Sequence, residues 1–356
     1  MDQAVSLRER KAGPIAWSKK SLRIADPQGP LVRVLSVSSG KGGVGKSSIV
    51  VNLAVAFAQL GKKVLIMDAD LGLANIDVLL GLTPKENIAH VLEGKRQLRE
   101  VIINGPGGVR IMPASSGVQQ LTRLTDEQKL LMLEMLDELE SEIDIFLVDT
   151  GAGISDTVLY FNLAAQEKIV VITPEPTSLT DAYALIKVLK ANGYTGRVSL
   201  FASQVKSSAE GHAVYRKIFS ASQRFLDVPV EFLGSVPYDR KLQLAVKDQV
   251  PVSVRYPTSD VARCYRVLAL ALLGQEAVGV DLERFWTRLV TLVTKARKPR
   301  TMRAVSFNGV SDTASLEKTF QDILSEQRKT RLLLERLVSS MEAVTLDPTT
   351  RKGSQA

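Results

Sequence analysis

Short apolar runs alternate with helix-like stretches through the middle of the chain. The strand-like runs cover residues 34–38, 64–67, 110–112, 145–148, 168–172, 198–202 and 232–236, and helical patterns cover residues 126–139, 179–190 and 259–272. Apolar strands separated by helices are typical of a parallel sheet with both faces covered. Residues 32–275 are therefore predicted to form a doubly wound, mainly parallel α/β domain, whose ligand sites lie at the carboxyl ends of its strands.

Two flanks with helical segments extend beyond this predicted domain. Residues 1–31 combine a helix-prone tip, DQAVSLR, with a linker rich in proline and glycine. On pattern alone, the tip fits the first turns of an exposed helix. Residues 299–356 read as a linker followed by an amphipathic helix over 315–344. This last helix could self-associate, fold back or bind a partner, and its pattern does not distinguish among these three possibilities.

A further amphipathic helix is predicted within residues 276–298, and it has an aromatic apolar face. That face consists of Leu282, Phe285, Trp286, Leu289, Leu292 and Val293, with Arg284, Arg288 and Lys295 elsewhere on the helix. An interfacial membrane helix has this character, because its apolar side enters the headgroup boundary while its cations meet anionic lipid. The alternative is a helix packed against the domain.

The composition is ordinary for a globular protein, with 45% hydrophobic and 24% charged residues among 356. The net charge of +8 lies in the flanks: residues 1–33 carry +4, 281–300 carry +4 and 301–356 carry +1, which leaves −1 for 34–280. This distribution argues against direct DNA binding by the domain. No run is apolar enough to span a bilayer, and the first residues are too polar for a signal peptide, so a cytoplasmic location is expected. The single cysteine, Cys264, excludes an internal disulfide, and the absence of a C-x-x-C motif argues against an iron–sulfur cluster or a thiolate-zinc site.

A glycine-rich turn joins the first predicted strand to the first helix. Its residues Gly40, Lys41, Gly42, Gly43, Val44, Gly45, Lys46 and Ser47 satisfy the phosphate-loop pattern G-x-x-x-x-G-K-[ST], and Ser48 continues it. Glycines let backbone N–H groups approach phosphate oxygens, and the following helix directs its positive end at the same anion. Lys46 is expected between the β- and γ-phosphates, and Ser47 on Mg²⁺. The alternative is a βα turn without a ligand.

Aspartates follow two of the predicted strands. Asp68 and Asp70 come after residues 64–67, and Asp149 follows residues 145–148. An aspartate at a strand end beside a phosphate loop can hold Mg²⁺ through water, a role predicted for Asp149. Asp70 is the candidate to orient the attacking water, and Asp68 to brace the site from behind. Each aspartate alone would also fit a helix cap or a solvated strand end.

Several segments together resemble the MinD/ParA/NifH class of ATPases. SSGKGGVGKSS, VLIMDADLGLANIDVLLGL, FLVDTGAGIS, TPEPTSLTDAYALIK and VPYD follow one another in the order of MinD-like proteins, over about residues 30–275. TPEPTSLTDAYALIK looks most like the FlhG family of flagellar-number regulators, also called FleN or YlxH. DQAVSLR matches the DQAxxLR motif that this family carries at its N-terminus and uses to stimulate the GTPase FlhF.

This resemblance implies a P-loop ATPase that forms a homodimer around two ATP molecules with Mg²⁺ and hydrolyses ATP slowly. Lys41 would reach the partner subunit's nucleotide and act in catalysis with Lys46 and Asp70, whereas its alternative is a solvated loop lysine. Gly151 would begin a loop that senses the γ-phosphate. The base would lie near Pro237, Tyr238 and Asp239, and Gln204 occupies the place where the family often has an adenine-reading asparagine. No N-K-x-D guanine motif occurs, which favours ATP over GTP.

The resemblance also implies partners and a location. Asp2, Gln3, Ala4, Leu7 and Arg8 would contact FlhF, and flagellar switch or C-ring components and a flagellar transcription regulator would be further partners. Leu282, Phe285, Trp286, Leu289 and Val293 would anchor the ATP-bound form to the inner face of the cell membrane, at a pole. Two other functions fit the same motifs. One is a MinD/ParA-type positioning ATPase for division or chromosome partition, and the other is a nucleotide-gated adaptor with little turnover.

Overall fold

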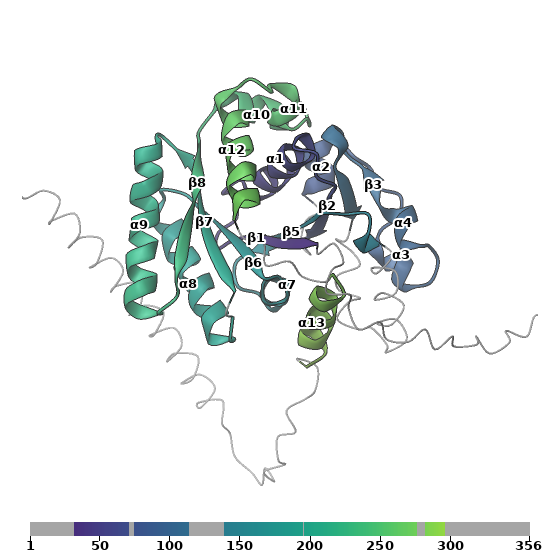
Figure 1. The fold of residues 1–356 in the computed structure, drawn as a ribbon, viewed down its shortest axis with the longest axis horizontal. Helices are drawn as coiled ribbons and strands as arrows, with labels where there is room; N and C mark the ends of the chain where they lie inside the picture. The colour runs from purple at the N-terminus through teal and green to yellow at the C-terminus, as the bar shows by residue number, and fades with distance from the viewer. Residues whose placement is uncertain (1–31, 71–74, 114–138, 195, 276–281, 296–356) are drawn as a thin grey trace, which may run out of the picture. The chain divides into compact units, whose positions relative to one another are not determined.

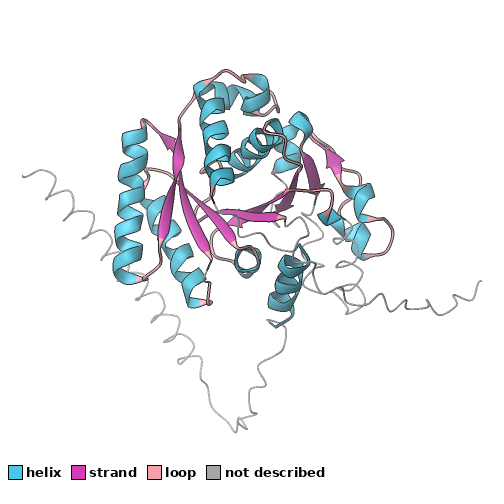
Figure 2. Cartoon of the chain, in the orientation of Figure 1, coloured by secondary structure: helices cyan, strands magenta, loops and turns pink. Residues whose placement is uncertain are grey.

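The computed structural model describes residues 32–70, 75–113, 139–194, 196–275 and 282–295 (Figure 1). The predicted N-terminal segment, nearly all of the helix expected at 126–139 and the helix expected at 315–344 lie outside these residues. The described parts are made of strands with helices on both sides of them (Figure 2). They form the α/β fold that the apolar pattern predicts.

The sheet of the described chain has eight strands in the order β3-β4-β2-β5-β1-β6-β7-β8. The strands are β1 (Arg33–Ser39), β2 (Val64–Ala69), β3 (Ile103–Asn104), β4 (Arg110–Pro113), β5 (Ile145–Ala152), β6 (Glu167–Ile172), β7 (Arg197–Val205) and β8 (Val230–Pro237). Every neighbouring pair is parallel except β3 with β4. All seven predicted strands are present. The added strand β3 has two residues, too few for a periodic pattern to indicate it.

Helices cover both faces of this sheet (Figure 1). One face carries α1 (Lys46–Gln59), α2 (Ile76–Leu80), α10 (Arg240–Lys247), α11 (Val252–Arg255) and α12 (Asp260–Gly274). The other carries α3 (Ile88–Leu92), α4 (Leu98–Val101), α7 (Asp156–Ala164), α8 (Pro176–Ala191), α9 (Ser208–Phe225) and α13 (Leu282–Lys295). A short 3-10 turn, η1 (Pro106–Gly108), precedes β4. The sheet is therefore doubly wound, as expected.

The central strands are buried on both sides because each face of the sheet has its own hydrophobic core. In β5, Ile145 and Leu147 pack into the core beneath α1 and α12, whereas Phe146 and Val148 pack into the core beneath α7 and α13. Successive side chains of a strand point to opposite faces, so both sets are buried. This arrangement leaves the carboxyl ends of β1, β2 and β5 side by side at one edge.

The helix α13 packs against the domain, which is the alternative that its amphipathic pattern also fits. Its apolar residues Leu282, Phe285, Trp286, Leu289 and Val293 are all buried in the core beneath α7 and β5. The Phe146 ring lies 5.7 Å from the Phe285 ring and 6.3 Å from the Trp286 ring, measured between centroids. In this docked position these side chains cannot reach lipid, because they complete one face of the protein core.

Candidate nucleotide-binding site

The glycine-rich loop lies between β1 and the first turn of α1, as its sequence predicts. Gly43 and Gly45 have φ values of +80° and +86°, which residues with a Cβ rarely adopt. A Cβ on Gly40 would collide with the backbone of Asp181 on α8, so the loop also needs glycine for close packing. A Cβ on Gly42 or Gly43 would meet nothing within 4 Å. The outer side of the loop is therefore open to a phosphate group.

A buried ion pair joins the loop lysine to the end of β5. Lys46 Nζ donates to Asp149 Oδ1, and the two residues are 7% and 0% exposed. Burial raises the pKa of Asp149, and the positive charge of Lys46 opposes that rise. Removing either partner would leave a buried charge unpaired. Asp149 thus holds the lysine that is expected to meet the phosphates.

Asp149 and Ser47 have the chemistry of a partial Mg²⁺ site. Asp149 Oδ2 is buried and has no hydrogen-bond partner within the described chain. The Ser47 side chain lowers the pKa of the Asp149 carboxylate. No cluster of three or more His, Cys, Asp or Glu that could hold a metal occurs among the described residues. Mg²⁺ keeps several waters and takes further oxygens from nucleotide phosphates, so Ser47 and Asp149 would hold the ion together with the nucleotide.

Asp68 organises the chain that follows β2. Its carboxylate accepts hydrogen bonds from the backbone N–H groups of Asp70, Asn75 and Ile76 at 3.1, 2.9 and 3.1 Å. Burial raises the pKa of Asp68 to about 6, and the charge of Asp149 adds to the rise. Asp68 therefore holds both ends of the segment that begins at Asp70, which is compatible with the bracing role predicted for it.

Asp70 lies beside the turn that follows β5. Asn75 Nδ2 donates to Asp70 Oδ2 at 3.2 Å, and a Cβ placed on Gly151 would lie 3.4 Å from Asp70 Oδ1. The turn itself is tied to β1, because the Gly153 N–H donates to the Ser39 carbonyl at 2.9 Å. The structure thus brings the predicted water-orienting aspartate next to the predicted γ-phosphate-sensing loop.

Lys41 contacts the first turn of α8 in its own chain. Its Nζ donates to Glu175 Oε2 at 2.6 Å and to Thr177 Oγ1 at 3.1 Å. The Lys41 and Glu175 side chains are 40% and 62% exposed, so water weakens their ion pair. Glu175 and Thr177 belong to the segment TPEPTSLTDAYALIK, but no role was predicted for either residue. A threonine and an acidic residue at the start of a predicted helix were the available signal.

The residues expected near the base lie on two neighbouring strand ends. Gln204, at the end of β7, has φ +58° and donates its Nε2 to the Gly43 carbonyl of the loop at 3.3 Å. The Tyr238 N–H donates to the Val205 carbonyl at 3.0 Å, just after Pro237 ends β8. Asp239 caps α10 by accepting from the Lys241 N–H at 2.7 Å. Gln204 therefore touches the phosphate loop, whereas a base contact by these residues stays a prediction.

The loop, the aspartates at the strand ends and the sheet order define a P-loop NTPase of the ParA class. A family model described as "ParA: NUBPL iron-transfer P-loop NTPase" matches residues 31–273. The chain therefore belongs to this family, whose general activity is ATP hydrolysis with Mg²⁺.

Among the described helices, none has both the length and the apolar character that a membrane-spanning helix requires.

Curated relatives identify the branch of the family. "Antiactivator FleN" of Pseudomonas aeruginosa is 45% identical over 238 residues, which cover 67% of this chain and 85% of that protein. "Flagellum site-determining protein YlxH" of Helicobacter pylori is 35% identical over 218 residues, covering 61% and 74%. The chain is thus a member of the FlhG family, also called FleN or YlxH, of MinD-like ATPases.

Solved structures show the same fold. MinD from Pyrococcus horikoshii, complexed with Mg-ADP, has a TM-score of 0.52 and 27% identity, covering 67% of this chain and 95% of that one. A chain of the "MinC:MinD cell division protein complex" of Aquifex aeolicus has a TM-score of 0.54 and 24% identity, covering 70% of this chain and 98% of that one. The first of these supports nucleotide and Mg²⁺ use by proteins of this fold, and the second supports the fold alone.

Proposed function

We propose that this protein is an ATP-driven switch that regulates flagellar number and placement. The observation that carries the proposal is a complete phosphate loop, with Lys46, Asp149 and Asp70 at adjoining strand ends, in a chain 45% identical to "Antiactivator FleN". The name of the Helicobacter pylori relative, "Flagellum site-determining protein YlxH", points to the same process. Slow hydrolysis suits such a switch, because the ATP-bound state must last long enough to act.

ATP is proposed to form the homodimer, with Lys41 of each subunit reaching the nucleotide of the other. Two features support this role. The Lys41 side chain is partly exposed, and its contacts with Glu175 and Thr177 are a surface ion pair and one hydrogen bond. Such contacts contribute little free energy, so a phosphate group can replace them.

The proposed partners act through the flanks and the flagellar apparatus. Residues Asp2 to Arg8 would stimulate FlhF, on the basis of the DQAxxLR match. The word "antiactivator" in the name of the Pseudomonas aeruginosa relative supports a transcription regulator as a target. Flagellar switch or C-ring components are proposed as structural partners on the family resemblance.

The proposed location is the cytoplasm, with reversible attachment to the inner face of the cell membrane at a pole. The support is the amphipathic, cationic pattern of residues 282–295. Since the apolar face of α13 is buried in the described state, attachment through this helix requires that it first leaves the domain. Undocking exposes Phe285 and Trp286 and removes them from the core, so it must be driven by another binding event.

The Asp70→Ala variant tests the switch. It removes the group expected to orient water while leaving Lys46 and the loop N–H groups in place, so we expect ATP binding without efficient hydrolysis. With ATP and Mg²⁺, the variant should elute as a dimer from gel filtration, and the wild-type protein should return to monomer as ATP is consumed. A variant that stays monomeric in ATP, or that hydrolyses ATP at the wild-type rate, contradicts the proposal.

A further inference from the structure

A buried polar network lies between α7 and the carboxyl end of β5. It joins Asn162 of α7 to Ser38 of β1 and to Thr150 of β5. Ser38 Oγ donates to Asn162 Oδ1 at 2.7 Å and lies 2.8 Å from Thr150 Oγ1. All three residues are 0% exposed, so water does not compete for these bonds. The network ends one residue before Gly151, where the turn expected to sense the γ-phosphate begins.

The orientation of the Asn162 amide is set by its partners. Its Nδ2 donates to the Val158 carbonyl, one turn earlier in α7, at 2.7 Å. Because only the amide nitrogen can donate to a carbonyl, Oδ1 faces β1. There it accepts from the hydroxyls of Ser38 and Ser36 at 2.7 and 3.1 Å. An amide oxygen has two acceptor positions, so both are filled by serines of the same strand.

The direction of these bonds follows from the number of hydrogens. Ser38 has one hydroxyl hydrogen, and it goes to Asn162, whose Oδ1 can only accept. In its pair with Thr150, Ser38 is therefore the acceptor and Thr150 the donor. Thr150 Oγ1 has two other acceptors within reach, the carbonyls of Val37 and Gly151, each at 3.1 Å. Asn162 thus determines, through Ser38, which of three acceptors receives the Thr150 hydrogen.

The helix α7 also contacts the turn directly. A Cβ placed on Gly151 would lie 3.2 Å from Val158 Cγ2 and 3.4 Å from Asp70 Oδ1. Gly151 therefore fits between α7 on one side and the aspartate expected to orient water on the other. Because the interior of a protein is close-packed, a small shift of this segment would change its distance to Asp70.

We propose that Asn162 and Ser38 are positioning residues that fix the Thr150 hydroxyl and so hold Gly151 beside Asp70, where the turn recognises the γ-phosphate. This inference rests on the proposed nucleotide-binding function. ADP has no γ-phosphate, so a contribution through the turn raises the affinity for ATP and not that for ADP. Its measure is the ratio of the Kd for Mg-ADP to the Kd for Mg-AMPPNP, a non-hydrolysable ATP analogue.

The Ser38→Ala variant removes one hydroxyl from the middle of the network. We expect calorimetry to give a Kd ratio about three- to tenfold below that of the wild type, the range of one neutral hydrogen bond. Ser36→Ala is the matched control, because this equally buried serine lies two residues earlier in β1. Its hydroxyl reaches Asn162 and the Glu167 carbonyl rather than the turn. It should lower the melting temperature and leave the ratio unchanged.

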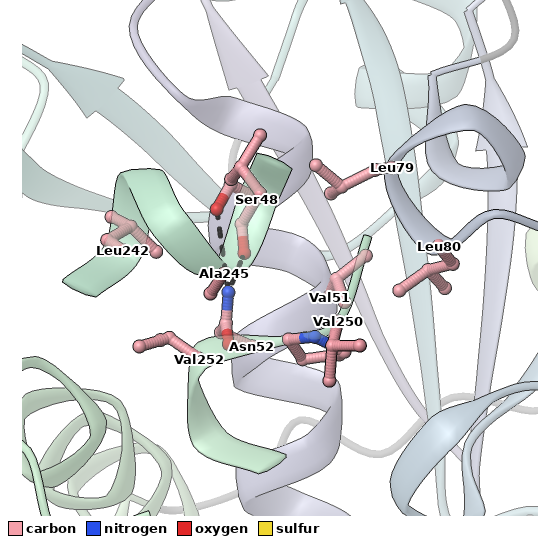
Figure 3. A pocket seen from close by; sticks show the side chains of 11 residues that line it. Ser48, Val51, Asn52, Leu79, Leu80, Leu242, Ala245, Val250 and Val252 are labelled. Atoms are coloured by element: carbon pink, nitrogen blue, oxygen red, sulfur yellow. Dashed lines mark hydrogen bonds between the residues drawn. The ribbon is translucent and has the colours of Figure 1, made fainter. Parts of the chain in front are cut away.

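The Asn162→Ala variant should lower the ratio as Ser38→Ala does, and the double variant should lower it no further. Asn52→Ala is the matched control in the helix that follows the phosphate loop. Asn52 is 2% exposed, and it accepts from the Ser253 N–H at 3.1 Å. Figure 3 shows its amide donating to Ser48, in a hollow lined largely by apolar side chains. Its loss should change both affinities alike.

Two results would overturn the positioning role while leaving nucleotide binding intact. One is an unchanged ratio in Ser38→Ala, the milder of the two network variants. The other is an equal fall of the ratio in Ser36→Ala or Asn52→Ala, which would mean that any lost buried hydrogen bond has this effect. A wild-type protein that binds neither Mg-ADP nor Mg-AMPPNP instead overturns the proposed function and, with it, this inference.

Discussion

At the scale of single residues, the two lysines of the phosphate loop have different surroundings and should have different roles. Lys46 is buried and paired with Asp149, whereas Lys41 is partly exposed and paired with Glu175 at the surface. The difference matters because a buried cation faces the site of its own chain, and an exposed one can leave its partner at little cost.

Lys46→Ala should abolish most of the ATP affinity, because it removes the cation at the β- and γ-phosphates. Lys41→Ala should retain much of that affinity and lose ATP-dependent dimerisation and hydrolysis. Calorimetric ATP titration of the two variants, followed by gel filtration in ATP, measures both effects. An equal loss of binding in both variants would show that Lys41 serves the nucleotide of its own subunit.

Asp68 should titrate unusually high for an aspartate. Its pKa is raised from 3.8 to about 6, so the folded chain binds this proton more tightly than the unfolded chain does. Asp68 therefore contributes stability below about pH 3.8 that is lost as the pH rises through about 6. The loss is on the order of 3 kcal/mol, at 1.36 kcal/mol per pKa unit. Carboxyl NMR titration measures the pKa directly, and Asp149→Asn should lower it. A wild-type midpoint near the ordinary aspartate value contradicts this explanation.

The phosphate-loop motif and the strand-end aspartates could be predicted from the sequence, whereas their partners could not. The motifs are local in sequence, since each follows a strand directly along the chain. They contain Lys46, Asp70 and Asp149. The contact of Lys41 with Glu175 joins residues 134 positions apart, and no local pattern indicates it. The same holds for Ser253 and Asn52, which are 201 positions apart.

At the scale of elements, α13 shows where a sequence pattern is ambiguous. A helix with an aromatic apolar face and a cationic opposite face fits a membrane surface and a protein core equally well, since both bury the apolar side. The deciding fact is the apolar surface of α7 and β5 that this helix covers, to which Phe146 contributes. That surface depends on the assembled fold and cannot be read from residues 282–295 alone.

Trp286→Ala should destabilise the folded protein by about 3 to 5 kcal/mol, because it removes a fully buried aromatic side chain from a closed core. Thermal and denaturant unfolding measure the change. Thr287→Ala, at the exposed neighbouring position, is the control and should be nearly neutral. If Trp286→Ala leaves stability unchanged but reduces binding to anionic vesicles, the undocked helix is the main state in solution.

At the scale of the whole molecule, the fold could be predicted because short, largely apolar strand patterns alternate with helical patterns along the chain. The strand order β3-β4-β2-β5-β1-β6-β7-β8 could not be predicted. Parallel strands are joined by crossover connections, and the hydrophobic pattern does not show which strands these connections place side by side. The order is what places β5 between β1 and β2, and so Asp149 between the phosphate loop and Asp70. The site is thus a consequence of topology as much as of motif.

The central claim is that nucleotide binding by this chain controls flagellar number. The most direct measurement is a count of flagella per cell by electron microscopy, in the organism that carries the gene, after its chromosomal copy is replaced by the Lys46→Ala form. Because that variant cannot hold ATP and a relative is named an antiactivator, the account predicts more flagella per cell than in the wild type, at equal protein levels. An unchanged flagellar count, with or without a defect in division or chromosome partition, would contradict it.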